Sequence, residues 1–127
     1  MMKPLALVFA AALVITGCVY DRYEHDDPTE QNDLEDVSLS EDLQPIFDQS
    51  CLGGGCHDQG AVIPYLEADV AYESLWDEDQ VDPDDPEGSI LYDRMVDESR
   101  PMPPGGLLPD RDAELVRAWI EQGAEDN

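Results

Sequence analysis

The chain has 127 residues, and its 31 Asp and Glu residues against 6 Lys and Arg residues give a formal net charge of −25. This length allows one small domain and excludes a doubly wound sheet, a barrel enzyme or a multidomain assembly. So acidic a chain is repelled by phosphates, which excludes direct binding to nucleic acid. An anionic lipid surface would repel it too, unless a covalent anchor held it there.

Residues 1–17 predict an export signal. Lys3 precedes an unbroken apolar run from Leu5 to Ile15, and the small residues Thr16 and Gly17 follow it. This run is too short to span a bilayer, but it has the length of the hydrophobic region of a signal peptide. We therefore expect residues 1–17 to be a cleaved signal peptide.

The end of this signal has a special form. Ile15-Thr16-Gly17-Cys18 resembles the lipobox of bacterial lipoproteins. The resemblance implies that Cys18 becomes the mature N-terminus and carries the lipid, which anchors the protein to a membrane of the bacterial cell envelope, at the periplasmic face or in the outer membrane. The alternative is an ordinary secretory signal that is cleaved nearby.

Residues 18–37 are predicted to be an acidic, flexible tether. From Val19 to Val37 the chain has 8 acidic residues, one arginine and few apolar side chains. Such a segment cannot bury enough surface to offset the entropy lost on ordering. His25 lies within it and is expected to be solvated.

The domain predicted for residues 38–127 has helical signals and almost no strand signals, which indicates an all-α fold. Ser38 to Glu41 has the spacing of a capping box. Leu43, Ile46 and Phe47 then form one apolar helical face. Because Pro45 cannot lie deep in a regular helix, this helix is expected to start near Gln44 or to be kinked there, and to run toward Cys51.

Three more helices are predicted downstream. Asp69 would cap a short helix that ends at Trp76, and Ser89 would open another that ends at Val96. The acidic, proline-containing segment 77–87 between them is expected to be a loop. Asp110 or Asp112 would cap the last helix, Gly123 would end it, and its apolar stripe consists of Leu115, Val116, Trp119 and Ile120.

The two cysteines inside the domain indicate a cofactor site. Cys51 and Cys56 are followed at once by His57, which gives the pattern C-x4-C-H. The common c-type haem attachment motif is C-x-x-C-H, in which two thiols add to the haem vinyl groups and the adjacent histidine becomes the proximal iron ligand. The glycines at 53–55 would let the longer segment fold back. The alternatives are a disulfide that closes this glycine loop and, more weakly, a zinc site.

Met102 is the predicted sixth ligand of such a haem. It lies in the segment 100–106, whose three prolines and two glycines exclude helix and central strand and form a rigid loop. A thioether ligand favours ferrous iron and raises the reduction potential. Met95 is the competing methionine, but it falls on an apolar helical face, where packing explains it.

Four segments, in this order, resemble a small class I cytochrome c domain of bacterial lipoproteins; they are residues 40–51, 85–92, 100–106 and 112–124. The resemblance covers roughly residues 39–124. It implies a cytochrome c-like helical domain around one covalently attached haem c. It also implies thioether bonds at Cys51 and Cys56, proximal ligation by His57, distal ligation by Met102, and packing of Trp119 near the haem or the helix crossing.

The predicted function is therefore that of a lipid-anchored, single-haem c-type cytochrome that transfers electrons in the cell envelope. Its acidity predicts redox partners with basic docking surfaces. The domain has no nucleophile–base pair and no second histidine, so we expect an electron carrier and not an enzyme. The alternative function is a non-redox exported lipoprotein module that has a Cys51–Cys56 disulfide and no haem.

Overall fold

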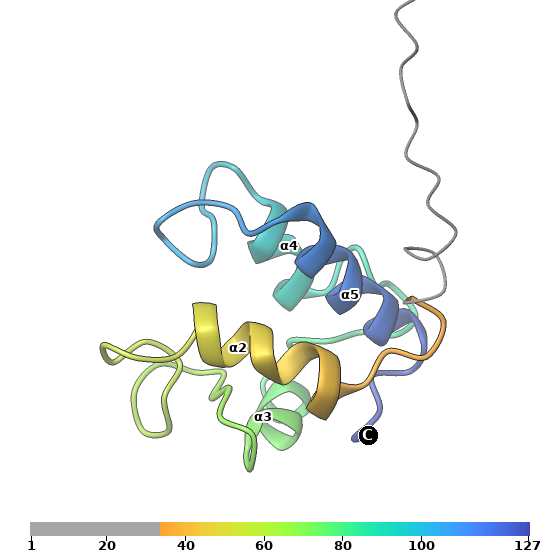
Figure 1. Cartoon of the computed structure of the whole chain (residues 1–127), viewed down its shortest axis with the longest axis horizontal. Coiled ribbons are helices and arrows are strands. Elements are labelled where there is room, and N and C mark those ends of the chain that lie inside the picture. Colours follow the sequence, from red (N-terminus) through yellow and green to blue (C-terminus); the bar gives the residue numbers. More distant parts are fainter. Residues whose placement is uncertain (1–33) are drawn as a thin grey trace, which may run out of the picture.

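The computed structural model describes residues 34–127, so the predicted signal peptide, Cys18 and His25 lie outside the described residues. In chain order the described part contains a π-helix η1 (Leu39–Leu43) and the α-helices α2 (Gln44–Ser50), α3 (Ala71–Asp77), α4 (Ile90–Val96) and α5 (Asp110–Glu121) (Figure 1). It contains no β-strand, which confirms the predicted all-α class for residues 34–127.

The first helical segment changes geometry where Pro45 enters. Ser38 accepts a hydrogen bond from the Glu41 amide at 3.2 Å, as a cap should. The return bond from the Ser38 amide goes to the Asp42 carboxylate at 2.8 Å and not to Glu41. A π-helical turn then runs into α2, which begins at Gln44 with proline in its first turn. The predicted change near Gln44 is thus confirmed, because proline is tolerated only where its missing N–H is not needed.

The expected cap of α3 is wrong, whereas Ser89 is the N-cap residue of α4 and the helix ends at Val96, as predicted, although the Ser89 side chain makes no capping hydrogen bond. No side chain caps α3, whose N-cap is Val70. A turn precedes the helix instead, in which the Val70 amide donates to the carbonyl of Glu67 at 3.0 Å. The Asp69 side chain therefore does not cap the helix. Ser89 does precede α4, but its hydroxyl accepts from the Asp82 amide at 2.8 Å, which ties the acidic loop to the helix start.

Helix α5 begins and ends close to the predicted positions. Pro109 is its N-cap, and Asp110 and Asp112 both lie in the first turn, so neither of them caps it. Their carboxylates still face the positive end of the helix dipole. Gly123 follows the C-cap residue Gln122 with a φ of 109°, a conformation in which glycine ends a helix at no steric cost.

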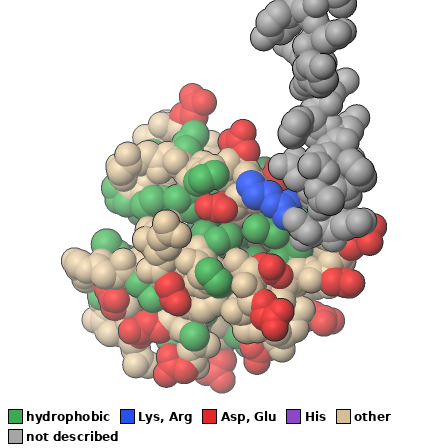
Figure 2. Space-filling view, in the orientation of Figure 1, with side chains coloured by type: hydrophobic (Ala, Val, Ile, Leu, Met, Phe, Trp, Pro, Cys, Tyr) green, Lys and Arg blue, Asp and Glu red, His purple; other side chains and the backbone are tan. Residues whose placement is uncertain are grey.

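The core lies around α5, which packs against η1 and α4 (Figure 1). Of its predicted stripe, Val116, Trp119 and Ile120 are buried, whereas Leu115 is only partly buried. The largest fully buried side chains are Trp119, Phe47, Leu43, Leu66, Leu75, Ile120, Val37 and Val116. Acidic side chains are spread over the face shown in Figure 2, on which basic side chains gather in one small area. No helix within residues 34–127 is long and apolar enough to cross a membrane.

The last residues of the predicted tether pack on the domain. Val37 is 1% exposed and belongs to the core. Its amide donates to the side-chain oxygen of Gln122 at 2.9 Å, and the side-chain nitrogen of Gln122 donates to the carbonyl of Leu34 at 2.6 Å. The folded unit therefore includes residues 34–37, because an apolar residue just before a helix cap gains burial by folding onto the next element.

Candidate functional site

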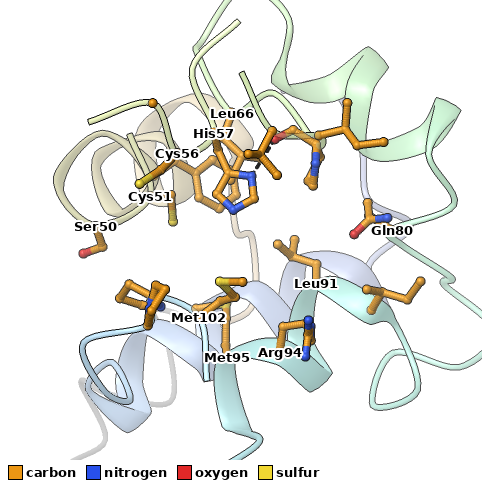
Figure 3. A pocket seen from close by; sticks show the side chains of 18 residues that line it. Ser50, Cys51, Cys56, His57, Leu66, Gln80, Leu91, Arg94, Met95 and Met102 are labelled. Carbon is orange, nitrogen blue, oxygen red and sulfur yellow. Dashed lines mark hydrogen bonds between the residues drawn. The ribbon is translucent and has the colours of Figure 1, made fainter. Parts of the chain in front are cut away.

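A pocket of about 460 Å³ lies between the segment around α2 and the segment around α4 (Figure 3). Cys51, Cys56, His57 and Met102 all line it, although 45 positions of sequence separate His57 from Met102. The structure thus brings the four residues predicted for the domain's site together. Most of the other lining side chains are apolar, and the volume is in the range of about 300–1,000 Å³ that is usual for ligand and cofactor sites.

His57 is held by its backbone and by its ring. The main-chain amide of His57 donates to the Cys51 carbonyl at 3.2 Å. The ring Nδ1 lies 2.8 Å from the carbonyl oxygen of Pro64. A carbonyl oxygen only accepts hydrogen bonds, so Nδ1 carries a proton, and in the neutral imidazole the lone pair is on Nε2. This is the tautomer that a metal-ligating histidine requires, and the carbonyl fixes the orientation of the ring.

Met102 approaches from the opposite wall. Its amide donates to the carbonyl of Arg94 at 2.7 Å, which ties the proline-rich loop to α4. Figure 3 shows its side chain across the pocket from the ring of His57. Met95 also lines the pocket but is only 6% exposed and belongs to the core cluster. Its burial agrees with the prediction that Met95 is a packing residue.

The two cysteines lie toward one end of the pocket and are free thiols (Figure 3). Cys51 packs against the core, and Cys56 is exposed. Burial raises the pKa of the Cys51 thiol to about 11, and the neighbouring Cys56 adds to this shift. Cys51 is therefore protonated at neutral pH, and its sulfur is a weak nucleophile there.

The different environments of the thiols predict ordered alkylation in the reduced, haem-free chain. At about pH 8 a thiol with a pKa near 11 is thiolate to about one part in a thousand. We therefore expect iodoacetamide to modify Cys56 well before Cys51, and the rate at Cys51 to rise with pH until its pKa is reached. Peptide mass spectrometry measures both rates, with the urea-unfolded chain as control. Equal rates at the two cysteines in the folded chain would contradict this prediction.

The glycine segment between the cysteines folds back on itself. Gly53, Gly54 and Gly55 have φ values of 90°, 66° and 80°, which side chains disfavour. The Gly53 amide donates to both carboxylate oxygens of Asp58 at 3.1 Å. Asp58 carried no signal in the sequence that pointed to this contact. The His57 amide donates to the Cys51 carbonyl, so the predicted folding back of the glycine segment is confirmed.

The loop predicts different outcomes for two glycine substitutions. Gly54→Ala is expected to lower the free energy of unfolding by about 1–2 kcal/mol, because the left-handed backbone conformation at this position is strained for a residue with a side chain. Gly105→Ala is the control: neither position has an atom that would meet the added methyl group, but Gly105 lacks the positive φ. Urea unfolding of both variants measures the difference. Equal losses of stability would show that the backbone conformation is not the cause.

Arg94 on α4 is a pocket residue that sequence analysis missed. A single cation on a predicted helix carries no signal of its own until the fold shows what it faces.

Among residues 34–127 no three His, Cys, Asp or Glu side chains are grouped in a way that would hold a metal ion.

The chain matches no family model, no curated protein and no solved structure.

Proposed function

We propose that the chain is a lipid-anchored, single-haem c-type cytochrome that transfers electrons in the cell envelope of a bacterium. One observation carries the proposal. His57, with Nδ1 bonded to the Pro64 carbonyl, lies across a mostly apolar pocket from Met102, and both cysteines lie toward one end of that pocket.

The pocket residues fit a haem. A flat, largely apolar macrocycle needs apolar walls, one iron ligand on each face and thiols at one edge. Large apolar side chains at the pocket also remain exposed, namely Val62 at 54%, Ile63 at 49% and Ile90 at 46%. Exposed apolar surface of this kind is typical of a binding site. Cys51 and Cys56 would form the thioether bonds of one haem c.

Each residue would have a separate task. When bound, the haem would supply the one-electron redox chemistry. His57 would be the proximal ligand, oriented by the Pro64 carbonyl, and Met102 would be the distal ligand, held by the Arg94 carbonyl. Leu66 and Leu91 line the pocket and would shield the bound haem from water. A thioether on one axial position favours the reduced state.

The anchor and the charge suggest how the cytochrome would meet its partners. We place the lipid on Cys18, with the acidic tether between the membrane and the domain. The net charge of −25 favours redox partners that have basic docking surfaces. Association with them would then slow as salt screens the attraction.

One observation also favours the alternative, a non-redox lipoprotein module with a Cys51–Cys56 disulfide. Cys56 contributes to the raised pKa of Cys51, so the two thiols are electrostatic neighbours. Oxidation outside the cytoplasm would close the glycine loop with a disulfide.

Visible spectra separate the two functions. The full chain is produced in a bacterium that has cytochrome c maturation proteins, and spectra are recorded after oxidation and after reduction. We expect haem bands that change reversibly between the two states. A colourless protein that shows the thiols of Cys51 and Cys56 only after treatment with a reductant would overturn the cytochrome and support the disulfide module.

A further inference from the structure

Among residues 34–127, the guanidinium of Arg94 forms no ion pair with a carboxylate, although the chain is very acidic. The other three arginines of the described part interact elsewhere: Arg100 pairs with Asp97, Arg117 pairs with Glu114 and Glu121, and Arg111 also has a partner. Within the described part of the chain, the side chain of Arg94 makes one hydrogen bond, from Nη1 to the Arg100 carbonyl at 3.4 Å. Its charge therefore remains available to an anion, and Arg94 lines the pocket.

The position of Arg94 in the pocket selects the kind of anion. Figure 3 shows the two cysteines toward one end of the pocket and Arg94 and Gln80 toward the other. A haem carries its vinyl groups on one edge and its two propionate carboxylates on the opposite edge. Thioether bonds at the cysteines would therefore direct the carboxylates toward Arg94 and Gln80.

We infer that the Arg94 guanidinium binds a haem propionate and holds the carboxylate edge of the cofactor, an inference that rests on the proposed cytochrome function. Arginine suits this task because its planar fork of donors matches a carboxylate. Gln80 is the weaker candidate, because its side-chain nitrogen already donates to the carbonyl of Glu78 at 2.7 Å. One N–H of that nitrogen remains for a carboxylate, but the amide is uncharged and its oxygen only accepts hydrogen bonds.

Infrared spectroscopy of the haem-loaded protein tests the contact directly. Cells are fed aminolevulinate that is isotopically labelled at the carbon that becomes the propionate carboxylate, so that only these groups shift. Reduced-minus-oxidised infrared spectra are then compared for the unaltered chain, Arg94→Gln and Arg94→Lys. Arg117→Gln serves as a charge-matched control, because Arg117 lies on α5 with its own carboxylate partners.

We expect Arg94→Gln to shift the labelled carboxylate bands and to lower the midpoint potential, because loss of a positive charge beside the haem favours ferric iron. Arg94→Lys should shift the bands but leave the midpoint potential close to that of the unaltered chain, since lysine keeps the positive charge but lacks the planar, paired donors of the guanidinium. Arg117→Gln should leave the bands in place.

Labelled bands that stay unchanged in both Arg94 variants would overturn the inference and leave the proposed function intact. If Arg94→Gln does not load haem, the Arg94→Lys bands decide the question alone. An unaltered chain that binds no haem would overturn the proposed function and this inference together.

Discussion

If the chain is the proposed cytochrome, replacing Met102 with alanine is expected to remove the sulfur-to-iron absorption band of the oxidised protein and to lower its midpoint potential. Met102 lies on the wall of the pocket opposite His57, and a thioether ligand stabilises ferrous iron. The fall should be roughly 0.1–0.3 V, a sizeable part of the about 0.8 V over which axial ligands set haem potentials. Spectroelectrochemistry of the purified protein measures both effects in one titration.

The matched control for this variant is Met95→Leu. Met95 lines the same pocket but is 6% exposed and packs in the core, so leucine should keep the absorption band and the potential. A conservative apolar exchange of this kind costs less than about 1.5 kcal/mol. If the band disappeared in Met95→Leu and persisted in Met102→Ala, the distal ligand would have to be reassigned to Met95.

The second large effect is on stability: Trp119→Ala is expected to lower the free energy of unfolding by about 3–5 kcal/mol. Trp119 is 1% exposed at the centre of the core, and its ring nitrogen donates to the Glu125 carbonyl at 2.9 Å. The substitution leaves a cavity and an unpaired acceptor near the chain that follows α5. A loss of this size is a large share of the roughly 5–15 kcal/mol that stabilises a typical domain.

Urea unfolding followed by circular dichroism measures this loss, with Leu107→Ala as the control. Leu107 is also a large apolar residue, but it is 47% exposed, so its truncation should change stability by less than about 0.5 kcal/mol. Similar losses in the two variants would show that the core is not organised around α5 as described.

The helices of this domain were predictable because their apolar side chains recur at helical spacing and because a proline or a glycine marks some of their ends. Pro45 marked the change at the start of α2, and Gly123 marked the end of α5. The missed cap at Asp69 and the packing of residues 34–37 have a different origin. Both depend on hydrogen bonds to distant or main-chain groups, such as the bond from Val37 to Gln122, that local sequence patterns do not encode.

The site was predictable as far as its side chains carry a signature. The spacing of Cys51, Cys56 and His57 and the proline-rich loop around Met102 can be read directly, and the fold brings these residues to one pocket. The carbonyl that orients His57 belongs to Pro64 and has no side-chain signal. Arg94 looked like any helix-surface cation, because only the fold shows that it faces the pocket.

The most direct measurement uses the full-length protein purified from a host that has cytochrome c maturation proteins. The protein is extracted with acid–acetone and digested with trypsin, and the mass of the peptide that contains residues 51–57 is measured. Covalent attachment predicts that the haem remains with the protein and that this peptide carries the mass of one haem. An unmodified peptide, with all haem in the acetone phase or with Cys51 and Cys56 joined as a disulfide, would contradict the assignment of a c-type cytochrome.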